Sequence, residues 1–358
     1  MIERWIRPLK PVGLVLLAAS VSIVRPQVGR SQEPLRDNRA ARRVDIQKVT
    51  TLRFQNLTVA PNIETRAFHM PDGGWGAISP VFDGIFPLFS ATGTPSGTLG
   101  RPGPGPGEFK NPVFAIVVGN QTWVVDPGNN RITAFGAKGS VLGDRTLPGR
   151  VIWAQPTADG SALLLSGFFG SPSGTWHTVG RVTIKTTDDV FGGDTGANPN
   201  GLVQQHLAAQ TPSGEIWAVA RAGGRIQILR SHNLGHVAST RLPEDLSQPE
   251  AHPPLYSSNE PPAPQVDGVM VDSNGILWIV MVVADAHWRS GLNLRTDPKK
   301  IFDTLLLAVS APDRAIVGVR RLDQNCRAMA AGLISCPNED AATVDIWRLS
   351  IERWVPAS

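Results

Sequence analysis

The chain has 358 residues, of which 41% are hydrophobic and only 18% are charged. This composition excludes a chain that is disordered throughout, because such chains combine low hydrophobicity with high net charge. The formal net charge is +4, but residues 1–32 hold five of the 34 Lys and Arg and one of the 30 Asp and Glu, which leaves 29 of each sign. A neutral body excludes nucleic-acid binding driven by a general basic field.

The N-terminus has the order of a secretory signal. A basic segment over residues 1–10 precedes an apolar run from Val12 to Val24, which is short for a membrane span. We therefore expect a signal peptide over residues 1–32 and a secreted or periplasmic protein that meets the membrane only during export. An uncleaved anchor helix is the alternative. Residues 33–48 are polar and charged and are predicted to be a linker.

The best-defined pattern is the segment from Leu99 to Gly139. A Gly/Pro run, Gly100–Gly107, precedes three expected strands at Val113–Val118, Thr122–Val125 and Arg131–Phe135. Its prolines lack amide donors, and neither a GK[ST] motif nor a helix follows it. The run is therefore not predicted to cradle a phosphate, and we expect it to connect two of the repeated strand units, the blades described below. Three antiparallel strands in so short a stretch leave no room for a helical crossover.

A turn followed by a strand with an early tryptophan recurs along the chain. The six copies end at Trp75, Trp123, Leu163, Trp217, Trp278 and Trp347, with 40 to 69 residues between successive copies. Repeats of this length built only from strands are typical of propeller blades. We predict an all-β, six-bladed β-propeller of four-stranded antiparallel blades over residues 49–358. A strand at 49–59 is expected to close the last blade and remove its open edge. A β-sandwich with a tryptophan core is the alternative.

One of these blades resembles a blade of the NHL-like six-bladed β-propellers. The residues that match are Gly105, Pro106, Gly107, Glu108, Phe109, Pro112, Trp123, Val124, Asp126, Asn130, Arg131, Ile132, Phe135 and Gly139. The resemblance implies a central channel lined by the first strand of each blade. It also implies a binding face made by the loops that enter these inner strands and by the loops between second and third strands.

On this fold, polar residues at the start of the inner strands are expected to line the channel mouth. They are Glu64, Arg66, Lys110, Asn111, Arg150, Gln204, His206, Gln265, Asp267, Asn325 and Arg327. Two long loops, 242–264 and 284–301, are expected on the same face. They carry the remaining predicted ligand-binding residues, which are His252, Tyr256, His287, Trp288 and Arg289. The alternatives are a water-filled pore and loops without a binding role.

The sequence favours a monomeric binding module over an enzyme, with a protein, peptide or saccharide ligand on the loop-rich face. No GxSxG, HExxH or CxxC motif occurs, and no cofactor is expected. The expected fold resembles that of six-bladed lactonases, which hold a calcium ion in the channel with Glu, Asn and Asp side chains. Glu64, Asn111 and Asp267 match these calcium ligands in residue type. His206 is the channel histidine that a lyase of this architecture would use. A metal-dependent lactonase or lyase at the channel mouth is therefore the alternative.

Three further features concern covalent and metal chemistry. Cys326 and Cys336 are the two cysteines, and in an exported chain we expect them to form a disulfide, with buried free thiols as the alternative. The acidic segment 188–201 is predicted to be a surface turn, with a Ca²⁺ loop as the alternative. His232 and His236 flank a turn and not a helix, so no zinc site is expected there.

Overall fold

The computed structural model describes residues 33–40, 42–137, 139–170, 174–184, 189–194, 205–247, 259–293 and 300–352. The chain divides into two compact units, Met1–Gln32 and Glu33–Ser358, and the first, predicted to be a signal peptide, lies outside the described residues. Among the residues described, no helix is long and apolar enough to cross a membrane.

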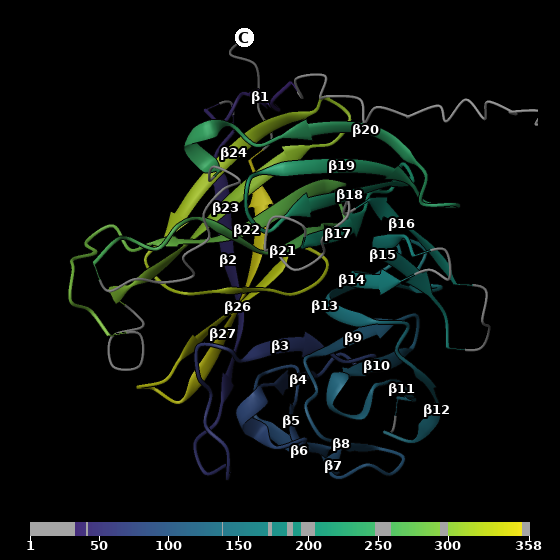
Figure 1. Ribbon diagram of the computed structural model, residues 1–358. Helices are drawn as coiled ribbons and strands as arrows, with labels where there is room; N and C mark the ends of the chain where they lie inside the picture. The colour runs from purple at the N-terminus through teal and green to yellow at the C-terminus, as the bar shows by residue number, and fades with distance from the viewer. Residues whose placement is uncertain are drawn as a thin grey trace, which may run out of the picture. The chain divides into compact units, whose positions relative to one another are not determined.

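The second unit is a six-bladed β-propeller of four-stranded antiparallel sheets (Figure 1). The first blade consists of β3 (Arg66–His69), β4 (Trp75–Ile78), β5 (Phe86–Phe89) and β6 (Pro95–Leu99). The second consists of β9 (Phe114–Val118), β10 (Gln121–Asp126), β11 (Arg131–Phe135) and β12 (Val141–Thr146). The third consists of β13 (Arg150–Pro156), β14 (Leu163–Gly170), β15 (Trp176–Val182) and β16 (Val190–Asp194). Strand β16 falls within the acidic segment predicted to be a turn.

The remaining blades follow the same order from the inner to the outer strand. The fourth consists of β17 (His206–Gln210), β18 (Glu215–Ala220), β19 (Arg225–Arg230) and β20 (His236–Arg241). The fifth consists of β21 (Gln265–Val271), β22 (Ile276–Ala284), β23 (Phe302–Ser310) and β24 (Ala315–Leu322). The sixth consists of β25 (Arg327–Ala328), β26 (Leu333–Asn338), β27 (Thr343–Ile351) and β2 (Val44–Arg53). From β3 through β9, β13, β17 and β21 to β25, each inner strand contacts the next, and β3 contacts β26 of the last blade.

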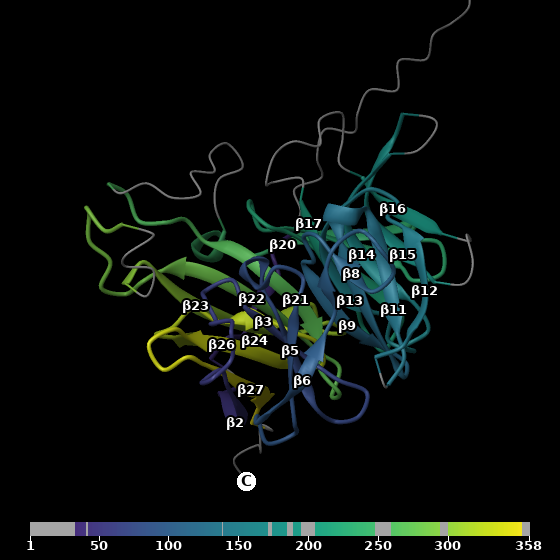
Figure 2. The same ribbon diagram turned by 90° about the horizontal axis from the view of Figure 1, so that it is seen from below.

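The predicted closure of the last blade by an N-terminal strand is confirmed. Strand β2 pairs antiparallel with β27 from Val44↔Ile351 to Arg53↔Thr343, and both views show the purple strand beside the yellow one (Figures 1 and 2). The strand begins at Val44, inside the segment predicted to be a linker, because Val44 is buried despite its charged neighbours. A two-residue strand, β1 (Arg36–Asp37), also pairs in parallel with β24. Neither pairing of residues 33–48 was predicted, because this segment is rich in charged residues, which are typical of a linker.

The recurring tryptophan was assigned correctly in four blades and wrongly in the last. Trp75, Trp123, Trp217 and Trp278 all lie on second strands, but Trp347 lies on β27, the third strand of its blade. The second strand there is β26, whose sequence LISCPN contains no aromatic residue. The turn before Trp347 therefore joins the second and third strands of the blade, and not the first and second strands as the pattern predicted.

The Gly/Pro run is held by the side chains of Arg131 and Glu108. The Arg131 guanidinium donates to the carbonyls of Pro104, Gly105 and Glu108, and Glu108 Oε2 accepts from the Gly105 amide over 2.7 Å. Within it, β7 (Arg101–Pro102) pairs in parallel with β8 (Glu108–Phe109), a short ladder that the sequence did not predict. The motif residues thus stabilise the connection between two blades.

The predicted disulfide is present between Cys326 and Cys336, with Cα atoms 4.2 Å apart. It ties the residue that precedes the inner strand β25 to the middle of β26. A disulfide is compatible with a location outside the cytoplasm, where such bonds persist.

Candidate functional site

A charged cluster crosses the central channel between inner strands of three blades. Asp267 of β21 accepts from Arg66 of β3 over 3.0 Å and from Arg327 of β25 over 2.7 Å. Asp267 is the extra residue of a β-bulge, since Val266 and Gly268 face consecutive residues of β22. A bulge turns a side chain away from the regular alternation, and here it directs a carboxylate to two arginines. Only 7% of the Asp267 side chain is exposed.

A third arginine lies near this carboxylate without pairing with it. Arg221 directly follows β18, and its Nη1 donates to Gln205 Oε1 over 3.0 Å. Burial lowers the pKa of Arg221 and of Arg66, while Asp267 opposes that effect in both. Burial alone would raise the pKa of Asp267, but Arg66 and Arg327 hold it well below its usual range. The cluster therefore carries three cations and one buried anion.

The cluster lies between two cavities of the channel, because Arg66 lines one of them and Asp267 and Arg327 line the other. The larger has a volume of about 590 Å³. It occupies the end where inner strands run into their first turns, opposite the predicted binding face. Its wall includes Phe68, Trp75, Phe114, Trp153, His69, Gln155, Met329 and Arg348.

Hydrogen bonds across the channel fix the inner end of the larger cavity. Trp153 Nε1 donates to the Val269 carbonyl over 3.3 Å, and Gln155 Nε2 donates to the Met329 carbonyl over 2.6 Å. The Trp153 ring fits because residue 268 is glycine, where a Cβ would lie 2.7 Å from the ring. The Arg66 guanidinium lies over this ring at 5.4 Å, an arrangement that stabilises a buried cation.

His69 and Trp75 both line the larger cavity. Their rings meet edge to face with centroids 4.9 Å apart. Burial lowers the pKa of His69 and so favours the neutral imidazole. The positive groups of the wall are therefore Arg66 and Arg348.

The smaller cavity, of about 250 Å³, lies where the inner strands begin, at the end of the channel predicted to bind ligand. Its lining comes from the starts of inner strands and the ends of second strands. The residues are Ile63, Arg221, Ala263, Gln265, Val266, Asp267, Val282, Phe302, Asn325 and Arg327.

The structure brings some predicted channel residues together and separates others. Asp267 and Arg327 form an ion pair, and the exposed Glu64 attracts the Arg66 charge. Asn111 is exposed and donates its backbone amide to Asp126, while His206 is fully buried at the start of β17. Neither of them lines either cavity.

The predicted binding residues of the two long loops, where the structure describes them, are not among the residues that line the cavities. His287, Trp288 and Arg289 follow β22, and none of them lines the two cavities. Trp288 donates its backbone amide to the Asp285 carbonyl over 3.1 Å. His252 and Tyr256 lie outside the described residues.

Sequence reasoning missed Arg221 and the aromatic wall. Arg221 follows an apolar strand at the channel mouth, and that position is the signal that could have identified it. Phe114 and Trp153 lie on inner strands, where a large ring must enter the channel. Their place in the repeat could have identified them as lining residues.

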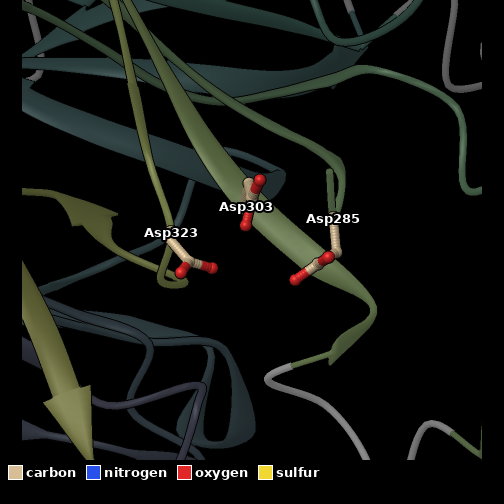
Figure 3. Close-up of side chains that lie close together, drawn as sticks. All are labelled: Asp285, Asp303 and Asp323. Atoms are coloured by element: carbon tan, nitrogen blue, oxygen red, sulfur yellow. The ribbon is translucent and has the colours of Figure 1, made fainter. Parts of the chain in front are cut away.

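Three aspartates form the group of potential metal ligands found among the described residues (Figure 3). One carboxylate oxygen from each of Asp285, Asp303 and Asp323 lies within 4.8 Å of the others. Asp303 is buried and accepts from Arg321 Nε over 2.5 Å. Burial raises the pKa of Asp303, and Arg321 opposes that effect. In the channel, by contrast, two guanidinium groups compete with any cation for the oxygens of Asp267.

No protein-family model matches the chain, and no curated protein does. Solved structures are similar in fold at low sequence identity. A member of the DUF4221 family from Bacteroides vulgatus ATCC 8482 is 10% identical with a TM-score of 0.59, covering 87% of this chain and 99% of its own. A protein from Bacteroides fragilis NCTC 9343, described as a candidate exported protein, is 10% identical with a TM-score of 0.56, covering 90% and 98%. At such identities the likeness establishes the six-bladed propeller fold and nothing further.

Proposed function

We propose that this protein is an exported binding module that takes up its ligand in the larger channel cavity. One observation carries the proposal: a cavity of about 590 Å³ with four aromatic side chains in its wall lies against a fixed arginine. Small-molecule sites are typically about 300–1,000 Å³ and mostly apolar with a few placed polar groups. The volume and the lining both fit that description.

The lining favours a ligand with a flat apolar body and an acidic group. Phe68, Trp75, Phe114 and Trp153 offer ring faces and edges, which bind apolar surface well. Arg66 and Arg348 supply positive charge. Of the ligand classes expected from the sequence, a peptide with an aromatic side chain fits best, because a saccharide needs many polar partners for its hydroxyl groups.

Binding is favoured over catalysis by what the wall contains. The described residues that line the larger cavity include no Ser, Cys, Asp or Glu, and its histidine has a lowered pKa. A metal-dependent lactonase or lyase would need its ion at the channel mouth, where Asp267 already pairs with two arginines. The side chains present therefore support recognition without a reaction.

Export and kinship with NHL-like propellers are parts of the same proposal. Export is supported by the basic and apolar order of the N-terminus together with the disulfide. Kinship is supported by Glu108 and Arg131, motif residues that hold the Gly/Pro connection in place. Recovery of the full-length, uncleaved chain from the cytoplasm of its native host would contradict the export part.

The test uses 8-anilinonaphthalene-1-sulfonate, a fluorescent probe with an aromatic body and one anionic group. We expect the folded protein to bind it with a stoichiometry of one. Ala330→Trp should abolish binding because it fills the cavity from its rim, whereas Ala341→Trp, on an exposed turn of the same blade, should not. Circular dichroism checks that both variants are folded. Equal binding by the two variants would place the probe elsewhere and overturn the proposal.

A further inference from the structure

We propose that the smaller cavity is a second ligand site, which binds a small organic carboxylate with an O–H or N–H donor next to the carboxylate. The site lies where the inner strands begin and is separated from the larger cavity by the charged cluster. Its volume of about 250 Å³ suits a molecule of a few heavy atoms or the last residue of a peptide. The proposal does not depend on what the larger cavity binds.

Charge is the first argument. Arg66, Arg221 and Arg327 surround the carboxylate of Asp267, which among the described residues receives hydrogen bonds from Arg66 and Arg327 but not from Arg221. Arg221 has no carboxylate within ion-pair distance among the described residues, and its hydrogen bond goes to the neutral Gln205. A buried charge without a counterion is costly, and an anion that binds beside it offsets that cost. The guanidinium fork also matches a carboxylate in geometry.

A buried acceptor is the second argument. Asn325 lines the smaller cavity and is only 8% exposed, yet its Oδ1 has no hydrogen-bond partner among the described residues. Buried acceptors are nearly always paired, since an unpaired one retains its full desolvation cost. An O–H or N–H group of a ligand would supply the hydrogen bond that Asn325 Oδ1 lacks. Arg221 lines the same cavity, whose volume of about 250 Å³ admits only a few heavy atoms, so the carboxylate and this donor must lie close together in the ligand.

The site is held ready by covalent and polar contacts. Cys326, between Asn325 and Arg327, is fixed by its disulfide to Cys336. Its amide donates to Thr304 Oγ1 over 2.7 Å, and that hydroxyl donates to the Gln324 carbonyl over 2.8 Å. Asn325 and Arg327, which both line the cavity, therefore flank an anchored position, and little conformational freedom is lost when a ligand binds.

Two sources offer this chemistry, namely a free hydroxy or amino acid and the C-terminus of a peptide. Both place a donor on the atom next to the carboxylate carbon. Val282 and Phe302 supply apolar wall for a small side chain in either case. The experiment separates the two sources.

Isothermal titration calorimetry is carried out with glycolate, glycine, acetate and glycolamide, and with N-acetyl-trialanine and its C-terminal amide. We expect saturable binding of glycolate or glycine if the source is a free acid, or of N-acetyl-trialanine if it is a peptide terminus. Acetate should bind at least about threefold more weakly than glycolate because it cannot reach Asn325, and the two amides should not bind. Failure of all three carboxylates with donors to bind the wild-type protein would overturn the proposal.

Two variants assign the site. Arg221→Gln should weaken binding about tenfold or more, and Asn325→Ala should remove the preference for glycolate over acetate. Arg230→Gln, at an exposed arginine of the same blade, is the matched control and should bind as the wild type does. The naphthalenesulfonate probe should still bind Arg221→Gln, so a failure here is distinct from a failure at the larger cavity. Equal affinity of Arg221→Gln and Arg230→Gln for the carboxylate would refute the site.

Discussion

Arg327 donates to Asp267 over 2.7 Å although 60 residues separate them and they lie on inner strands of neighbouring blades. The same carboxylate receives Arg66 from the first blade, 201 residues away in sequence. Three blades therefore meet at one buried carboxylate, and the disulfide beside Arg327 fixes one of the arginines. We therefore expect the stability of the ring to depend on this contact.

Replacing Asp267 with Asn should strongly destabilise the protein. The change leaves the guanidinium groups of Arg66 and Arg327 without their carboxylate, and breaking a buried ion pair from one side typically costs about 3–5 kcal/mol. Asp144→Asn is the control, because that half-exposed carboxylate lies 3.8 Å from Arg131 and should contribute less than about 1 kcal/mol. Urea denaturation measures both. Equal losses in the two variants would show that the cluster adds no more stability than a surface pair.

The contribution of Asp267 should depend on pH in a defined direction. Its pKa in the folded protein is held below the ordinary value of about 3.8 by Arg66 and Arg327. The unfolded chain therefore binds the proton more readily, so this stabilisation is complete above about pH 5 and is lost as the pH falls. The gap in unfolding free energy between wild type and Asp267→Asn should shrink by about 1.4 kcal/mol per pH unit below about pH 4. Urea titrations from pH 7 to pH 2.5 check this, and a gap that stays constant would contradict it.

Removing the disulfide should weaken the fold and the smaller cavity together. Opening the short loop between Cys326 and Cys336 with serine at both positions should cost about 2–3 kcal/mol in the chain-entropy model. The melting temperature of the wild type should fall in reductant, while that of the double variant should not change. Carboxylate binding should weaken as well, because Asn325 and Arg327 flank Cys326. An identical wild-type melting curve with and without reductant would rule out a stabilising role.

The closing strand offers a matched pair of truncations. Leu52 of β2 is fully buried in a cluster with Val344 and Ile346, whereas Val49 on the same strand is 39% exposed. Leu52→Ala should cost about 2–5 kcal/mol, and Val49→Ala should cost less than about 1 kcal/mol. Thermal and urea unfolding of the two variants provide the comparison. Similar costs would mean that β2 contributes through its backbone pairing alone.

Local patterns predicted much of the fold. Turn residues and strand-forming side chains located β9 to β11 within one residue, and the recurring tryptophan placed four second strands, because both signals act over a few residues. Trp347 was misplaced because β26 has no ring at the equivalent position. Val44 was missed because charged neighbours hid a strand whose partner lies at the other end of the chain.

The candidate site was less predictable than the fold. Asp267 and Arg327 were expected at the channel because inner strands converge there. The larger cavity was not expected at the opposite end, since it depends on where small side chains such as Ala115 and Ala154 leave space beside large rings. Arg221 was missed for a similar reason: its role depends on the distance between blades, which no local pattern encodes.

The pairing of β2 with β27 also constrains the order of assembly. Thr51 and Asp345 are hydrogen-bonded across 294 residues, so β2 has no partner strand until β27 has been synthesised. Contacts that are so distant in sequence form slowly, because the entropy of closing a long loop must be overcome first. The first five blades can each form from a continuous stretch of chain, but a polypeptide released before residue 343 cannot complete its ring. Such an interrupted chain leaves the backbone groups along the edge of β2 unpaired, which exposes them to pairing with other chains.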